Sequence, residues 1–253
     1  MTCKGLILAG GKGTRLLPVT RVINKHMVPI LNRPMILFPL DTLKSLGITD
    51  IMIVSGGEHI GGIAEFLGDG SEFGVNLTYR VQMEAGGIGQ ALGLAKDFVG
   101  DDSVAVILGD NVFENAFDIS NVMLINTDTE KYKNRAHIFV KEVSPEEGTR
   151  FGILTDGVLK FGKCIVEKPK KIETEIALAV TGLYIYPPDV FDVVAKQKPS
   201  ARGEMEISDI NNHYLLGGSC EVHPIIGFWS DAGTPESLKE VIDWAFKNMP
   251  KID

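Results

Sequence analysis

Three short apolar runs in the first half of the chain constrain its fold more than any other feature. They cover residues 6–9, 51–54 and 104–108, and each continues into a loop that contains glycine. Continuous apolar runs of this length are typical of strands that are covered on both faces of a sheet. Helical patterns at 34–46 and 58–67 lie between them, and this alternation predicts an α/β fold with a mostly parallel sheet flanked by helices.

The carboxyl ends of these strands mark the place where a ligand would bind. Open α/β sheets bind ligands in the crevice beyond the carboxyl ends of their strands. The glycine-rich loop after the first run, residues 82–89 and Asp110 all follow predicted strand ends. We therefore expect them to line one crevice.

The second half of the chain has more strands and fewer helices. We expect strands at 137–143, 151–155, 158–167, 177–186 and 222–228, helices at 189–196 and 208–216, and a polar loop at 142–150. Thr234 followed by Pro235 is typical of a helix start, with threonine as the cap and proline at the first helical position. No repeat or linker divides the chain, so we interpret residues 1–253 as one domain with two halves, 1–125 and 126–253.

The first loop has the composition of a phosphate cradle. Gly10, Gly11 and Gly13 expose backbone N–H groups without Cβ atoms in the way. Neither common phosphate loop fits, because Leu16 stands where a dinucleotide loop needs its last glycine and residues 11–13 are not the Gly-Lys-Ser/Thr of a P-loop. We interpret the loop as a phosphate site of a third kind; the alternative is a plain turn after an edge strand.

The charge pattern favours a bound polyanion at this end of the chain. The first forty residues carry six lysine or arginine side chains and no acid, although 33 acids in 253 residues would place about five there. Arg15 can bind two phosphate oxygens at once, while Lys25 supplies a point charge. The alternative for each is a solvated surface cation.

Two aspartates follow apolar runs and could hold a metal ion. Asp110 comes directly after the third run and a glycine, and Asp231 lies between an apolar stretch and the last predicted helix. Two carboxylates together with phosphate oxygens and water suit Mg²⁺, which prefers hard oxygen ligands. The residues alone equally allow Asp110 to be a turn residue and Asp231 a helix cap.

A second basic group could bind a phosphate monoester. Lys168 abuts the end of a predicted strand, and its neighbour Glu167 could accept hydrogen bonds from sugar hydroxyls. Arg202 lies in a predicted loop, where its fork of donors suits a phosphate; the alternative is a surface salt bridge.

Composition excludes several other classes of protein. A formal net charge of -8 argues against coating nucleic acid. The three cysteines form no metal-ligand spacing, which indicates a reducing, cytoplasmic location. No apolar run approaches the roughly 18 residues of a transmembrane helix, and we expect neither a signal peptide nor membrane association.

Seven motifs in order along the chain resemble those of the sugar-phosphate nucleotidylyltransferases, and within them the short-form glucose-1-phosphate thymidylyltransferases. They are Leu8 to Leu16, Lys25, Leu108 to Asn111, Glu167 to Pro169, Val180 to Tyr184, Ser200 to Glu204 with Asp209 to Asn211, and Trp229 to Thr234. The resemblance covers nearly the whole chain. It implies a Rossmann-like mixed sheet of the nucleotide-diphospho-sugar transferase type, with a nucleotide-binding first half and a sugar-phosphate-binding second half.

The resemblance also implies a role for each candidate residue. The nucleotide would contact Leu8, Ala9, Gly10, Gly11, Gly13, Thr14, Arg15, Gln82, Gly87 and Asp110. The sugar phosphate would contact Glu167, Lys168, Thr181, Gly182 and Arg202. Asp110 and Asp231 would hold Mg²⁺, and Arg15 and Lys25 would stabilise the leaving pyrophosphate.

The substrates implied are dTTP and glucose 1-phosphate, in nucleotide-sugar biosynthesis for the dTDP-rhamnose pathway and polysaccharides, by a homo-oligomer (dimer or tetramer). Use of UTP, CTP or another sugar 1-phosphate is a second hypothesis, because thymine and uracil differ by one methyl group. A non-catalytic regulator that binds a nucleotide sugar is a third. Retention of Arg15, Lys25, Asp110, Lys168 and Asp231 argues against the regulator.

Overall fold

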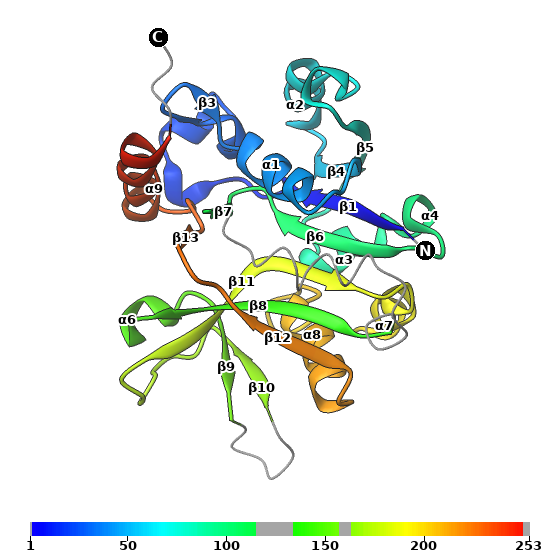
Figure 1. Cartoon of the computed structure of the whole chain (residues 1–253), viewed down its shortest axis with the longest axis vertical. Coiled ribbons are helices and arrows are strands. Elements are labelled where there is room, and N and C mark those ends of the chain that lie inside the picture. Colours follow the sequence, from blue (N-terminus) through cyan, green and yellow to red (C-terminus); the bar gives the residue numbers. More distant parts are fainter. Residues whose placement is uncertain (1, 115–133, 157–162, 250–253) are drawn as a thin grey trace.

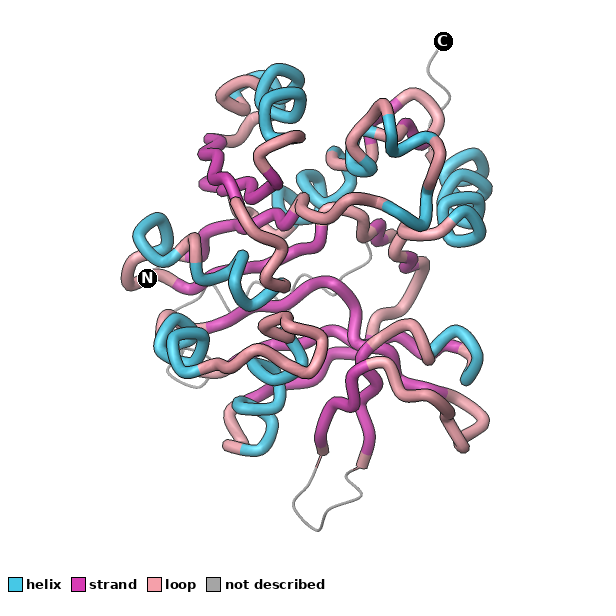
Figure 2. The backbone as a smooth tube through the Cα atoms, turned by 180° about the vertical axis from the view of Figure 1, so that it is seen from behind, coloured by secondary structure: helices cyan, strands magenta, loops and turns pink. Residues whose placement is uncertain are grey.

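The computed structural model describes residues 2–114, 134–156 and 163–249, and its centre is a nine-stranded sheet. Seven strands follow one another in the order β10-β9-β11-β6-β1-β4-β5, while β8 pairs with β11 and β12 pairs with β8 (Figure 1). Helices lie on both sides of the strands in the two opposite views (Figures 1 and 2). The predicted α/β class is therefore confirmed; the predicted boundary near residue 125 lies outside the described residues.

The nine strands of the sheet are β1 (Cys3–Leu8), β4 (Asp50–Gly56), β5 (Asn76–Gln82), β6 (Ser103–Leu108), β8 (Ala136–Val143), β9 (Gly152–Thr155), β10 (Cys164–Glu167), β11 (Ala177–Tyr186) and β12 (Cys220–Pro224). Two short pairs lie outside it, β2 (Pro29–Ile30) with β3 (Arg33–Pro34) and β7 (Val112–Phe113) with β13 (Trp229–Ser230). The described helices are α1 (Leu37–Ser45), α2 (Ile60–Leu67), α3 (Ile88–Gly93), α4 (Lys96–Val99), α6 (Pro145–Gly148), α7 (Val190–Lys196), α8 (Ile207–Leu216) and α9 (Pro235–Asn248).

The strands of the first half pair in parallel, β6 with β1, β1 with β4 and β4 with β5. β11 then joins β6 in the antiparallel direction, and it also pairs antiparallel with β8 and β9. Parallel pairing places the ends of β1, β5 and β6 on one edge of the sheet, as expected from the sequence. The sheet is therefore mixed, with its antiparallel part in the second half.

The alternation of side chains explains why the first strands are continuously apolar. In β1, Ile7 packs on the face that α1 and α2 cover, whereas Leu6 and Leu8 pack on the face that α3, α7 and α8 cover. Ile7 and Leu6 are both 0% exposed. Because each face has its own apolar cluster, a strand that is apolar at every position buries every side chain.

Several element boundaries differ from the sequence expectation. The helix predicted from Pro34 begins at Leu37, because Arg33 and Pro34 form the short strand β3. The predicted loop at 142–150 contains α6, which Ser144 caps through its side chain. The strand predicted at 222–228 is found only in part: β12 ends at Pro224, residues 225–228 lie in no strand, and β13 begins at Trp229. The beginning of the predicted strand at 158–167 lies outside the described residues.

The predicted start of the last helix is confirmed. Thr234 caps α9: its hydroxyl accepts from the backbone N–H of Ser237, the Ser237 hydroxyl accepts from the backbone N–H of Thr234, and Pro235 follows the cap. We expect Thr234→Ala to lower the free energy of unfolding by about 1 kcal/mol in urea denaturation, because one end of this capping box is lost. Thr234→Ser retains the hydroxyl and should unfold like the wild type; equal stability of both variants would contradict the cap assignment.

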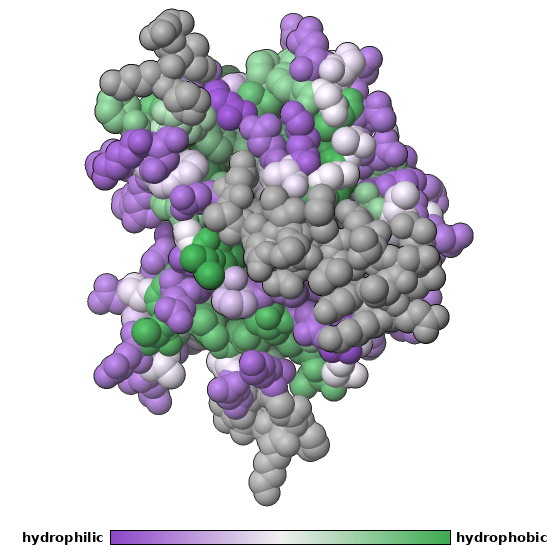
Figure 3. All heavy atoms as spheres, viewed as in Figure 1, coloured by the Kyte–Doolittle hydropathy of each residue, from purple (hydrophilic) through white to green (hydrophobic). Residues whose placement is uncertain are grey.

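Hydrophilic and apolar residues are mixed on the face of the molecule shown in Figure 3. The exposed apolar residues include Val22, Met83, Ile226 and Phe246. Within residues 2–114, 134–156 and 163–249, no helix is long and apolar enough to cross a membrane.

Candidate active site

One cavity lies at the carboxyl ends of β1, β5 and β6, where the sequence predicts the ligand crevice. Its volume is about 260 Å³. Seven of the residues predicted to bind the nucleotide or to act in catalysis line it: Leu8, Gly10, Gly11, Lys25, Gln82, Gly87 and Asp110. From the predicted sugar-phosphate set it is lined by Glu167, Lys168 and Arg202. The structure thus brings ten predicted residues from both halves of the chain around one space.

The other predicted residues lie outside this lining. They are Ala9, Gly13, Thr14, Arg15, Thr181, Gly182 and Asp231. Ala9 and Thr181 are 0% exposed, so only a backbone group of either could meet a ligand without rearrangement. Arg15 and Gly13 lie farther along the glycine loop, in or next to the short helix η1 (Thr14–Leu16).

The glycine loop is folded against the segment that carries Lys25. Gly13 has a φ of +60°, and a Cβ placed on it would lie 2.8 Å from Thr20 Cγ2 and 3.1 Å from Lys25 Cβ. The Thr20 hydroxyl donates to the Gly13 carbonyl at 2.8 Å. Glycine at position 13 therefore permits both the backbone angle and the close approach that brings Lys25 to the cavity.

Asp110 and Lys25 form a mostly buried ion pair at the cavity wall. Lys25 Nζ lies 2.6 Å from Asp110 Oδ2, and their side chains are 15% and 11% exposed. Burial raises the pKa of the Asp110 carboxyl, but the Lys25 charge and the hydrogen bonds from Lys25 and Asn111 outweigh it, so the pKa lies below its ordinary value. Asp110 is therefore an ionised carboxylate at neutral pH.

The buried side chain of Asn111, to which the sequence assigned no individual role, makes hydrogen bonds to three other residues. Its Oδ1 accepts from the Gly182 backbone N–H at 2.9 Å and from Trp229 Nε1 at 2.7 Å, and its Nδ2 donates to Asp110 Oδ1 at 3.1 Å. The amide thereby ties the end of β6 to β11 and β13. The N–H of Gly182 is used here, so a sugar could not accept a hydrogen bond from it without displacing Asn111.

Asp231 lies one residue beyond β13, and Asp110 lies two residues before β7, the strand with which β13 pairs. Ser230 pairs with Val112 in the antiparallel direction, so the two segments that carry the aspartates enter the same strand pair. Asp231 Oδ1 accepts from Arg150 Nη2 at 2.5 Å. A Cβ placed on Gly233 would lie 3.0 Å from Arg15 Nη2 and 3.2 Å from Asp231 Oδ2, so Arg15 reaches this carboxylate region from the glycine loop.

The sugar-phosphate candidates form a group of mixed charge. Arg202 donates to Glu206 through Nε at 3.0 Å and through Nη2 at 2.7 Å, and Nη2 lies 3.5 Å from Glu167 Oε1. Glu206 was missed because it lies at the N-cap of α8 and Arg202 in the loop before it, so the loop conformation brings the two side chains together. Lys168 has a φ of +43°, an uncommon angle for a residue other than glycine, and such strain is frequent at functional sites.

Two loops from different halves of the chain close the cavity on one side. Met205 donates its backbone N–H to the Gly86 carbonyl, and its own carbonyl accepts from the N–H of Gly89, both at 2.8 Å. Gln82 Nε2 donates to Gln90 Oε1 at 2.8 Å, which fixes the predicted base-reading side chain. Gln90 was missed because no local pattern links it to Gln82.

The carboxylates present fit a divalent cation. Asp110 is ionised, and Asp231 directly follows β13, the partner of the strand β7 that begins two residues after Asp110. In the part of the chain that the structure describes, no group of three or more His, Cys, Asp or Glu residues could hold a metal by itself. Two carboxylates completed by phosphate oxygens and water match the way in which proteins usually bind Mg²⁺.

Two buried histidines make the stability of the folded protein depend on pH. His26 and His137 are each 1% exposed, and burial is the main cause that lowers the pKa of both imidazoles to about 3. Unfolding restores a pKa of about 6.5, so below that pH the unfolded chain binds more protons than the folded protein. Stability is therefore lost as the pH falls from about 6.5 toward 3.

We expect each imidazole to remove about 2 kcal/mol of stability between pH 7 and pH 5. In His137→Gln, the difference in unfolding free energy between these two pH values should be smaller by that amount, as measured by urea denaturation. His213, on α8, is exposed, so His213→Gln should keep the wild-type pH dependence. A His137→Gln variant as sensitive to acid as the wild type would contradict this assignment.

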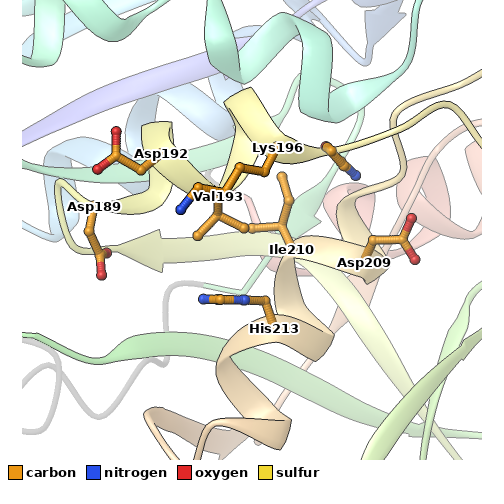
Figure 4. Close-up of a pocket in the computed structure, with 8 residues that line it drawn as sticks. Asp189, Asp192, Val193, Lys196, Asp209, Ile210 and His213 are labelled. Carbon is orange, nitrogen blue, oxygen red and sulfur yellow. The ribbon is translucent and has the colours of Figure 1, made fainter.

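A second hollow, of about 400 Å³, lies between α7 and α8 (Figure 4). Its labelled side chains include Asp192 and Lys196 from α7 and Asp209 and His213 from α8. None of the predicted site residues lines it. The chemistry expected from the sequence belongs to the smaller cavity.

Known proteins share both the sequence and the fold. A family model described as nucleotidyl transferase matches residues 4–246, so the chain belongs to the nucleotidyl transferase family. It is 40% identical over 239 residues to the glucose-1-phosphate thymidylyltransferase of Neisseria meningitidis serogroup A, covering 94% of this chain and 80% of that protein. The resemblance stated from the sequence motifs is thereby confirmed.

Solved structures extend the likeness. A Bacillus anthracis protein assigned as a glucose-1-phosphate thymidylyltransferase, in complex with sucrose, is 44% identical with a TM-score of 0.86 and covers 100% of this chain and 98% of its own. UDP-glucose pyrophosphorylase complexed with UDP-glucose is 25% identical with a TM-score of 0.83, covering 98% of this chain and 99% of its own. The nucleotidyltransferase fold is therefore shown over the whole length of the chain.

Proposed function

We propose that this protein transfers the thymidylyl group of dTTP to glucose 1-phosphate, giving dTDP-glucose and pyrophosphate. The observation that carries the proposal is a single cavity that joins the glycine loop, the Lys25–Asp110 pair and the group of Glu167, Lys168 and Arg202. The thymidylyltransferase relative at 40% identity supports this choice of substrates.

The two halves of the chain divide the binding work in this proposal. Residues 1–125 would bind the nucleotide, with phosphates along the glycine loop and the base near Gln82 and Gly87. Residues 126–253 would bind the sugar phosphate, with Lys168 and Arg202 on its phosphate and Glu167 on the sugar. The backbone contacts between Met205 and the loop at Gly86 to Gly89 hold the two sets of residues against each other.

The reaction needs positioning and charge neutralisation rather than a general base. An oxygen of the sugar phosphate attacks the α-phosphorus of dTTP; as the new P–O bond forms, the bond from α-phosphorus to the bridging oxygen breaks and pyrophosphate leaves. The attacking oxygen is already anionic, so no proton has to be removed. Arg15 and Lys25 would neutralise the pyrophosphate, which lowers the barrier electrostatically.

Asp110 and Asp231 would hold Mg²⁺, which, when bound, supplies positive charge to the phosphate oxygens. The ionised state of Asp110 at neutral pH supports this part of the proposal. Asn111 would keep Asp110 in place, because its amide donates to Oδ1 of that carboxylate.

Uridylyl transfer from UTP is the second candidate function. The fold match to UDP-glucose pyrophosphorylase at 25% identity favours it over other nucleotides. One methyl group in a pocket is worth only about 1–3 kcal/mol of discrimination, so a preference for thymidine is a matter of degree.

Pyrophosphate release across dTTP, UTP, CTP and GTP, each paired with several sugar 1-phosphates, tests the proposal. We expect the highest kcat/KM for dTTP with glucose 1-phosphate and a lower value for UTP. A higher value for UTP would replace the proposal with the second candidate. No release with any pair would favour a non-catalytic regulator.

A further inference from the structure

Asp231 is paired with a cation that neither the motifs nor the proposed reaction assigns. Arg150 Nη2 lies 2.5 Å from Asp231 Oδ1, and their side chains are 29% and 13% exposed. Arg150 follows α6 and lies 81 positions from its partner in the sequence. The inference drawn from this pair rests on the proposed function, because it concerns the cation site that Asp231 would help to form.

Both candidate metal-binding carboxylates carry a basic side chain of their own. Lys25 is bound to Asp110, and Arg150 is bound to Asp231, each through a short contact to a single oxygen. Lys25 and Asp110 line the cavity, whereas neither Arg150 nor Asp231 does. The Arg150–Asp231 pair therefore lies outside the lined space, where the arginine could stay while substrates occupy the cavity.

Packing holds the Arg150 guanidinium in this position. It lies over the Phe151 ring at 5.1 Å from the ring centre, and Phe151 packs against Trp229 with ring centres 5.0 Å apart. Trp229 in turn donates to Asn111, which also holds Asp110. A continuous series of contacts thus links Arg150, the partner of Asp231, to Asn111, which holds Asp110.

Arg150 also acts on a second carboxyl group. Burial raises the pKa of the Glu147 carboxyl, the charges of Glu240 and Asp231 add to this rise, and the Arg150 charge partly offsets it. Arg150 therefore supplies positive charge to both Asp231 and Glu147, and its removal would leave both carboxyl groups without that charge.

We propose that Arg150 is a positioning residue that fixes and neutralises Asp231 through Oδ1 until a divalent cation arrives together with the triphosphate. In the free protein a dication near Asp231 is repelled by the Arg150 charge, so it binds weakly. The negative phosphates of the nucleotide offset that repulsion. The arginine thereby couples occupancy of the cation site to occupancy of the nucleotide site.

Titration of the free protein with Mn²⁺, followed by electron paramagnetic resonance without any substrate, tests this role. Arg150→Gln keeps a donor for Asp231 but loses the charge, and we expect it to bind Mn²⁺ about fivefold tighter or more. Arg150→Lys keeps the charge and should bind as weakly as the wild type. The double variant Arg150→Gln, Asp231→Asn should bind no tighter than Asp231→Asn alone.

Equal or weaker Mn²⁺ binding by Arg150→Gln, or no detectable binding by either protein, would overturn the proposal. Tighter binding by Arg150→Lys would overturn it as well, and this arm remains available if Arg150→Gln does not fold. A gain that persists in the double variant would show that the effect does not act through Asp231 and would overturn the stated role. Because no substrate is present, these outcomes are separate from the pyrophosphate-release assay that decides the function.

Discussion

We expect Asp110→Asn to lower kcat for pyrophosphate release by about a thousandfold or more, because it removes a preorganised charge from the reacting site. The carboxylate is buried and ionised, so asparagine, which has nearly the same shape, removes the charge with little change in volume. It also leaves the ammonium of Lys25 without its partner at 2.6 Å. The measurement is a steady-state assay with dTTP and glucose 1-phosphate in Mg²⁺.

The control for this variant is another aspartate with a lysine partner. Asp243 lies 2.5 Å from Lys239 on the exposed surface of α9, so Asp243→Asn makes the same chemical change far from the cavity. It should keep the wild-type kcat. Circular dichroism should show native secondary structure for both variants, and a folded Asp110→Asn protein within tenfold of the wild-type kcat would refute the role of this carboxylate.

Asn111→Ala has the largest expected effect on stability. The side chain is 1% exposed and serves as the common acceptor for two buried donors, the Gly182 N–H and Trp229 Nε1. An unsatisfied buried donor costs about 1–3 kcal/mol, so the variant should lose about 4 kcal/mol of unfolding free energy in urea denaturation. Asn76→Ala, on the exposed end of β5, should lose less than about 0.5 kcal/mol.

A companion variant separates the stability role of Asn111 from its role toward Asp110. Asn111→Asp keeps an acceptor for both donors but replaces the amide that donates to Asp110 with a second negative charge. The repulsion between this charge and Asp110 should remove most of the activity from protein that circular dichroism shows to be folded. Wild-type turnover of Asn111→Asp would show that the 3.1 Å hydrogen bond from Asn111 to Asp110 does not contribute to activity.

The strands and the ligand edge could be predicted because their signals are local. The run that became β1 is apolar at every position since both faces of the strand are covered, and its glycine loop follows directly. Thr234 and Pro235 predicted the start of α9 for the same reason, because a helix cap depends on a few neighbouring residues. Strand composition and helix caps depend only on residues of the same element or its immediate neighbours.

The contacts that hold the site together could not be predicted in this way. Arg150 meets Asp231 across 81 positions, and Asn111 meets Trp229 across 118, so only the assembled sheet brings them within reach. Read locally, Asn111 is a good turn residue after Asp110, which conceals its role as an acceptor. The pair of Arg202 and Glu206 is no exception, because both residues precede α8 and their contact depends on the conformation of that loop.

The most direct measurement is product identification by mass spectrometry and phosphorus NMR after incubation with dTTP, glucose 1-phosphate and Mg²⁺. The proposed reaction forms one P–O bond for each one broken, so dTDP-glucose and pyrophosphate should appear in equal amounts, and adding pyrophosphate to dTDP-glucose should regenerate dTTP. A folded protein that binds dTDP-glucose but neither forms it from dTTP and glucose 1-phosphate nor converts it back with pyrophosphate would contradict catalysis and leave a nucleotide-sugar-binding regulator on the same fold.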